Sequence, residues 1–129
     1  MKVVVLAAVI TALFASCAHN VWLSDATVNA NAKTPTELMR RLGSPAKVID
    51  NQRLPLHKGK AQEYRYFVVT QSGQVEFRQY FFDGPKWITM TFPVPESEKG
   101  DRFKVISPTS MRFRERLERL WKVRPDLRP

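Results

Sequence analysis

The chain has 129 residues, the usual size of one domain, and 43% of them are hydrophobic, which excludes global disorder. Its formal net charge of +9 favours acidic partners, namely anionic lipid, nucleic acid or an acidic protein surface. From Arg102 to the end, nine Lys and Arg stand against three Asp and Glu, so the last 28 residues carry a net charge of +6.

The first residues have the pattern of an export signal. Lys2 is followed by an apolar run from Val3 to Phe14, and small residues lead to Cys17. The run is too short to cross a bilayer core, which needs about 20 helical residues. The stretch LFASC at 13–17 resembles a bacterial lipobox, so we predict a lipoprotein signal peptide over 1–17 with Cys17 lipidated. Ordinary cleavage after Ala18 and a retained apolar helix are the alternatives.

The single cysteine limits the chemistry that the sequence supports. Cys17 has no second cysteine for a disulfide, and a nucleophile needs a base close by. His19 and His57 lie in segments with loop character, without other ligand-type residues at suitable spacing. Glu96 and Glu98 are best explained as solvated residues of a Pro-rich loop. We therefore predict no catalytic residue, no metal site and no cofactor, and we expect a protein that is not an enzyme.

Residues 18–33 are polar and show no clear period, so we predict a flexible tether there. The exception is the apolar stretch VWL at 21–23, which includes Trp22. It is either a short segment pinned onto the domain or the membrane surface, or a partner-binding peptide. After the tether we predict a single α+β domain over residues 34–125.

The stretch TPTELMRRLGSP at 34–45 predicts a short helix. Thr34 suits the N-cap, and Glu37 stands three residues later, as in a capping box. Leu38 and Leu42 are four residues apart and share one face of the helix. Gly43 suits the end of the helix.

Three strands are predicted after residue 62. Glu63–Thr70, Val75–Phe82 and Lys86–Phe92 are rich in aromatic and β-branched residues, and short turn signals separate them. Such turns predict an antiparallel meander. A short strand at Ala46–Ile49 and an edge strand at Arg102–Ile106 are further possibilities. The predicted fold class is α+β, with a three- to four-stranded antiparallel sheet that has one buried and one wetter face.

Alternation along these strands predicts which side chains form the core. The residues that we expect to be buried are Tyr66, Val68, Val75, Phe77, Phe81, Ile88, Met90 and Phe92.

The C-terminal stretch SPTSMRFRERLERLWKVRP predicts an amphipathic helix. Thr109 or Ser110 would cap it, and Pro125 bounds it. Its apolar stripe is formed by Phe113, Leu117, Leu120 and Trp121. We expect this helix and the first one to cover the same face of the sheet, with the charged side of the C-terminal helix in solvent.

The first helix and the strands together resemble the SmpA/OmlA (BamE-like) family of small outer-membrane lipoproteins. The residues that match the family's first-helix motif are Thr34, Glu37, Leu38, Leu42, Gly43 and Pro45. The aromatic strand from Glu63 and the later strand before Phe92 are comparable too, so the match spans residues 33–92. A second early helix and a glycine before the threonine, usual in the family, are not evident here. The resemblance implies a helix-plus-sheet binding module at the periplasmic face of the outer membrane.

The leading interpretation is a bacterial envelope lipoprotein that acts as a non-catalytic binding or scaffold subunit of an outer-membrane or secretion assembly. Its partners would be envelope proteins, the membrane through the N-terminal lipid, and anionic lipid head groups; export excludes nucleic acid. Export without an anchor, to the periplasm or the medium, is the alternative location. The alternative function is an inhibitor or immunity-type protein that blocks an enzyme through a basic or aromatic face. The residues predicted to contact a partner are Trp22, Tyr64, Tyr80, Trp87, Arg112, Arg114, Arg119 and Lys122.

Overall fold

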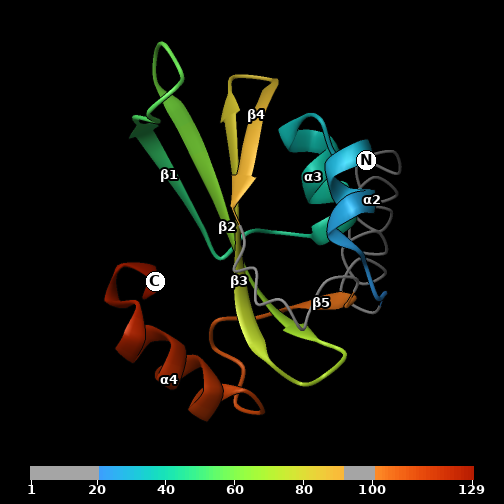
Figure 1. Cartoon of the computed structure of the whole chain (residues 1–129). Helices are drawn as coiled ribbons and strands as arrows, with labels where there is room; N and C mark the ends of the chain where they lie inside the picture. Colours follow the sequence, from blue (N-terminus) through green and yellow to red (C-terminus); the bar gives the residue numbers. More distant parts are fainter. Residues whose placement is uncertain (1–20, 92–100) are drawn as a thin grey trace, which may run out of the picture.

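A five-stranded antiparallel sheet forms the centre of the computed structural model, which describes residues 21–91 and 101–129 (Figure 1). β1 (Lys47–Gln52), β2 (Ala61–Thr70), β3 (Val75–Asp83) and β4 (Lys86–Thr91) follow one another as a meander. β5 (Phe103–Ile106) returns to β2 and pairs with it beyond the end of β1, along the same edge. The α+β fold class and the predicted meander are confirmed. The predictions for Cys17, His19, Phe92, Glu96 and Glu98 lie outside the described residues.

Both faces of the sheet are covered, so the prediction of one buried and one wetter face is wrong. The register between β2 and β3 sets Tyr66 opposite Arg78 and Phe67 opposite Phe77. Because neighbouring residues of a strand point to opposite faces, these two pairs belong to different faces. The core residues of the first face are Tyr64, Tyr66, Val68, Tyr80, Phe82, Phe103 and Val105. Phe67 and Phe77 belong to a separate cluster on the second face.

The residues predicted to be buried therefore mix the two faces. Tyr66 and Val68 are fully buried on the first face, whereas Phe77 is buried on the second. Phe81 is also buried. The remaining members that the structure describes, Val75, Ile88 and Met90, are only partly buried.

Helix α2 (Asp25–Asn31) occupies the segment that was predicted to be a tether. Ser24 caps it, because its Oγ accepts a hydrogen bond from the backbone N–H of Thr27 at 3.1 Å. Val28 and Ala32 are completely buried in the core of the first face. The tether prediction is wrong for the described part of residues 18–33, because this helix has an apolar side that the sheet buries.

Helix α3 (Pro35–Leu42) matches the predicted first helix. Thr34 Oγ1 accepts a hydrogen bond from the N–H of Glu37 at 3.2 Å, which is one half of the predicted capping box. In the other half, Glu37 Oε2 accepts from the N–H of Lys33 at 3.4 Å instead of from the N-cap residue. Leu38 and Leu42 are fully buried beside α2.

Helix α4 (Arg114–Val123) lies on the second face of the sheet, opposite α2 and α3, so the prediction that both helices cover one face is wrong (Figure 1). Its Trp121 meets Phe67 edge-to-face, with ring centroids 5.6 Å apart. The short 3-10 helix η2 (Pro125–Leu127) follows and buries Leu127 in the same cluster.

The start of α4 also differs from the prediction. Ser107 accepts hydrogen bonds from the N–H of Thr109 at 3.2 Å and, through its carbonyl, from the N–H of Ser110 at 3.1 Å. Thr109 and Ser110, the two predicted cap residues, therefore belong to a turn, and the helix begins only at Arg114.

Candidate binding surface

Two of the aromatic residues predicted to contact a partner are in the core. Tyr64 is nine-tenths buried and Tyr80 is completely buried, so neither is exposed as predicted. Trp87 is half-buried and packs edge-to-face on Phe82, with ring centroids 5.4 Å apart. These rings stabilise the first face of the sheet and present little area to a partner.

The predicted basic residues lie together on one helix. The inner side of α4 buries Leu117 and Trp121, which leaves the other side in solvent. We call this exposed part the outer side of α4. Apart from Arg116, which reaches the carbonyl oxygen of Gly73, its exposed residues are Arg114, Glu115, Arg119, Lys122 and Val123. The amphipathic pattern that forms the helix is therefore also what gathers these cations on one surface.

Ion pairs neutralise part of the charge on and beside α4. Arg128 Nη2 binds Glu118 Oε2 at 2.7 Å, and this hydrogen bond lowers the pKa of the Glu118 carboxyl. Arg124 binds Asp126 at 2.8 Å and lowers the pKa of that carboxyl in the same way. Both pairs are exposed, so their contribution to stability is small.

Other cations on and beside α4 have no such short ion pair among the described residues. Arg119 is 3.5 Å from Glu115, which is a long and exposed contact. Arg112, Arg114 and Lys122 form no ion pair with any residue of 21–91 or 101–129. The outer side of α4, with Arg112 just before it, therefore presents cations that are available to an anionic partner.

Two buried arginines form ion pairs that were not anticipated from the sequence. On the first face, Arg78 binds Asp25 through Nε at 2.8 Å and Glu76 through Nη1 at 2.9 Å. Burial opposes the charged form of Arg78, but the two carboxylates outweigh it and raise the pKa of the guanidinium. On the second face, Arg65 binds Glu63 at 2.7 Å.

Each of the two arginines holds a neighbouring segment onto the sheet. Asp25 is the first residue of α2, so its bond to Arg78 ties that helix to β3. Arg65 Nη1 also donates to the carbonyl oxygen of Asp126 at 3.0 Å, which ties the C-terminal segment to β2. We assign these groups to stability rather than to binding, because they are enclosed.

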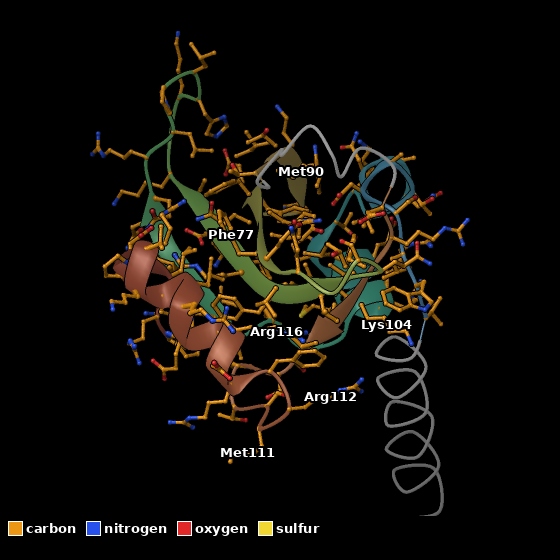
Figure 2. The ribbon with its side chains drawn as sticks, turned by 60° about the horizontal axis from the view of Figure 1, so that its bottom comes forward. Phe77, Met90, Lys104, Met111, Arg112 and Arg116 are labelled. Atoms are coloured by element: carbon orange, nitrogen blue, oxygen red, sulfur yellow. The ribbon has the colours of Figure 1, made fainter. Side chains whose placement is uncertain are left out.

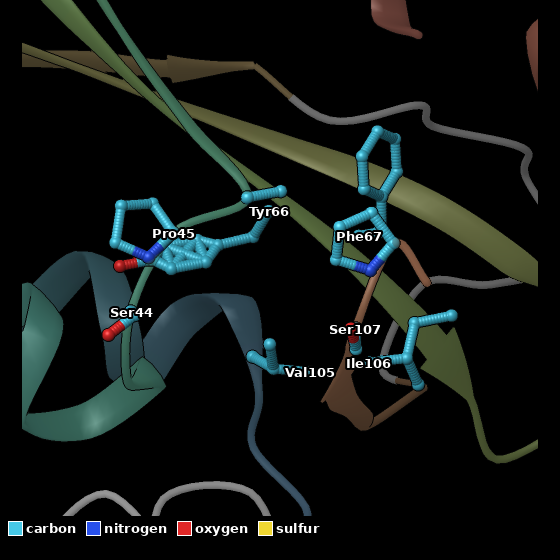
Figure 3. A pocket seen from close by; sticks show the side chains of 9 residues that line it. Ser44, Pro45, Tyr66, Phe67, Val105, Ile106 and Ser107 are labelled. Atoms are coloured by element: carbon cyan, nitrogen blue, oxygen red, sulfur yellow. The ribbon is translucent and has the colours of Figure 1, made fainter. Parts of the chain in front are cut away.

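A pocket of about 480 Å³ opens where β1 and β5 leave a gap along β2. Figure 3 shows side chains of Ser44, Pro45, Tyr66, Phe67, Ile106 and Ser107 around it. The hydroxyl of Tyr66 is already used, because it donates to the carbonyl oxygen of Gly43 at 2.9 Å. Burial raises the pKa of Tyr66 far above its ordinary value. The lining therefore suits a small apolar group and not acid–base chemistry.

His57 has a partner that the sequence did not indicate. Its Nε2 lies 3.0 Å from Oδ2 of Asp83. The structure brings these two residues together from the β1–β2 loop and the end of β3. In the part of the chain that the structure describes, no three His, Cys, Asp or Glu residues are placed to hold a metal ion.

Comparisons with known proteins returned no match: no protein-family model, no curated protein and no solved structure is similar to this chain. Within the described ranges, no helix has the length and apolar character needed to span a membrane.

Proposed function

We propose that this chain is a non-catalytic binding module of the bacterial cell envelope, anchored at the periplasmic face of the outer membrane through a lipid on Cys17. The outer side of α4 would contact an acidic surface of an envelope protein. The observation that carries this proposal is that Arg114 and Lys122 are exposed, and form no ion pair within the described ranges, on a helix whose other side is buried. Arginine side chains and their charge-assisted hydrogen bonds are well suited to such contacts.

Features outside α4 support the same proposal. The lipobox resemblance at Cys17 supports the anchor. The first-helix motif of the SmpA/OmlA (BamE-like) lipoproteins, which the sequence resembles, falls on α3, and the strands that the resemblance covers are β2 and β4. The family assignment remains part of the proposal.

Site-specific crosslinking in intact cells tests the partner. A photoreactive residue at position 114 or 122 should crosslink to an envelope protein, and one at Asn29, exposed on α2 across the sheet, should not. A third photoreactive position, 119, then reports the effect of charge. The double variant Arg114→Glu with Lys122→Glu should abolish the crosslink from position 119. The control variant Arg40→Glu with Lys47→Glu should preserve it. Equal crosslinking from α2 and α4 would contradict the assignment of this surface.

The anchor needs a separate test. Cys17→Ala should abolish both acyl labelling and membrane fractionation, while the circular dichroism spectrum of the domain stays the same. Unchanged fractionation would show that Cys17 is not the site of attachment.

A second candidate function, inhibition of an enzyme, is favoured by the β1–β2 loop. This loop of residues 53–60 projects from one end of the sheet (Figure 1), and the side chain of Leu56 is fully exposed. Lys58 and Lys60 follow it in the loop, so the loop combines an apolar side chain with positive charge. If this candidate is right, a co-purifying hydrolase should be inhibited by the chain, and Leu56→Asp should relieve the inhibition.

A further inference from the structure

The described domain begins very close to the predicted anchor. Leu23 and Phe103 exchange two backbone hydrogen bonds of 2.8 Å each, so the chain is fixed to β5 at that point. Cys17 precedes Val21 by only four residues. Because an extended chain advances about 3.5 Å per residue, Val21 can lie at most about 14 Å from the lipidated residue. The part of the domain around Leu23 must then face the bilayer.

This part of the surface combines positive charge with an interfacial aromatic ring. Trp22 is half-buried, and Nζ of Lys104 lies 4.5 Å from the centre of its ring. Arg102 is exposed one residue before β5, and Val21 is half exposed. Tryptophan is enriched at the level of lipid head groups because its ring is amphipathic.

The basic surface continues to the start of α4 through the β2–β3 turn. The N–H of Gln71 donates to the carbonyl oxygen of Arg102 at 3.0 Å. On the other side of the turn, Arg116 Nη1 donates to the carbonyl oxygen of Gly73 at 3.0 Å. The first residues of β5 and the first turn of α4 are therefore neighbours, with only the turn between them.

Figure 2 shows the side chains of Lys104, Met111, Arg112 and Arg116 at this end of the molecule. Met111 is 79% exposed, and Arg112 beside it is exposed as well. We call this surface the β5 end, and it consists of Val21, Trp22, Arg102, Lys104, Met111, Arg112 and Arg116. Four of these residues are cations. The neighbouring carboxylate of Asp101 accepts a hydrogen bond from Ser72 at 3.0 Å.

We propose that the β5 end is a docking surface for anionic phospholipid head groups of the membrane that holds the lipid anchor. The inference rests on the proposed acylation of Cys17, which brings this surface to the bilayer. Arg102, Lys104, Arg112 and Arg116 bind lipid phosphates, and Trp22 lies at head-group level. The β1–β2 loop, at the opposite end of β2, then points away from the membrane. The anchor and the basic surface together fix the orientation of the domain.

The test uses the mature acylated protein, purified from membranes and reconstituted into vesicles of phosphatidylcholine with or without phosphatidylglycerol. A lipid with a nitroxide on its head group quenches tryptophans that lie at the surface. The variant Trp22→Phe isolates the signal of Trp22, because Trp87 is on β4 and Trp121 is buried between α4 and the sheet. We expect quenching of most of the Trp22 emission in anionic vesicles and little quenching in the Trp22→Phe protein.

Charge variants distinguish docking from simple proximity to the anchor. Arg102→Glu with Arg112→Glu should lower the equilibrium constant for docking by roughly a factor of five or more, since each cation near an anionic surface contributes about that factor. The matched control is Lys58→Glu with Lys60→Glu, the same change of charge at the opposite end, and it should leave quenching unchanged. Salt at 1 M should weaken docking because the Debye length falls to about 3 Å.

The outcomes separate this inference from the proposed function. An acylated chain in which Trp22 is not quenched, or is quenched equally in both kinds of vesicle, would overturn the docking surface and leave the anchored binding module intact. Intact mass without an acyl group would overturn the anchor and, with it, this inference. Equal effects of the two charge variants would also overturn the assignment to the β5 end.

Discussion

Arg78 and Asp25 lie 53 positions apart in the sequence and are joined by two hydrogen bonds, Nε to Oδ1 at 2.8 Å and Nη2 to Oδ2 at 3.2 Å. This paired geometry is the stronger form of an arginine–carboxylate contact. It holds the first turn of α2 against β3, and the guanidinium also lies 4.9 Å from the ring of Phe103 on β5. One buried arginine therefore connects α2, β3 and β5.

Asp25→Asn should lower the free energy of unfolding by about 1.5–3 kcal/mol, because hydrogen bonds to charged groups contribute about that much. Asparagine keeps the size of the side chain and removes the charge that balances the enclosed guanidinium. Urea unfolding followed by circular dichroism measures the change. Glu115→Gln, on the exposed side of α4, is the control and should change stability by less than about 0.5 kcal/mol. Equal stability of both variants would show that the pair does not hold α2.

Two neighbouring tyrosines should respond in opposite ways to removal of the hydroxyl group. Tyr66 donates to the carbonyl oxygen of Gly43 at 2.9 Å, so Tyr66→Phe should cost about 0.5–1.5 kcal/mol. The Tyr80 hydroxyl is buried and has no hydrogen-bond partner in the described ranges, so Tyr80→Phe should be neutral or stabilising. Thermal unfolding of the two variants checks this, and a large loss from Tyr80→Phe would reveal a partner for its hydroxyl.

The core on the first face should be sensitive to truncation at α3. Leu42 is fully buried beside α2 and the sheet, so Leu42→Ala should destabilise the domain by about 2–5 kcal/mol. Met39 on the same helix is exposed, and Met39→Ala should stay within about 0.5 kcal/mol. A change below about 0.5 kcal/mol for Leu42→Ala would show that α3 does not contribute to the core in solution.

The strands and α3 could be predicted because their signals are local. A turn at Ser72-Gly73, where Gly73 has φ of 91°, and the cap at Thr34 depend on residues a few positions apart. Helix α2 could not be found in that way, because seven residues with Val28 and Ala32 as the buried side give no measurable period.

The coverage of both sheet faces was missed for a different reason. Aromatic residues occupy successive positions at Tyr66 and Phe67, which leaves no alternation to choose one face. A strand that is apolar on both sides is itself a sign of two-sided burial, and this sign was available in the sequence. The same error affected the residues predicted to contact a partner. The cations of α4 were predicted as exposed and are exposed, while Tyr64 and Tyr80 were placed on a wetter face that does not exist.

The ion pair between Arg128 and Glu118 should make the attachment of the C-terminal segment depend on pH. Arg128 lowers the pKa of Glu118 in the folded protein below its ordinary value, so the pair stabilises the folded state above the unfolded pKa of about 4.3. That contribution is lost as the pH falls below about 4 and the carboxylate is protonated.

The C-terminal segment should therefore loosen over Trp121, since the guanidinium of Arg128 lies 5.1 Å from the centre of that ring. Unfolding midpoints of the wild type and of Glu118→Gln, measured from neutral to acidic pH, should converge as the pH falls. Glu115→Gln serves as the matched control, because the one ion pair of its carboxylate among the described residues is the long contact to Arg119 at 3.5 Å. If the unfolding midpoints of wild type and Glu118→Gln moved further apart on acidification, the ion pair would not stabilise the folded protein in the way described.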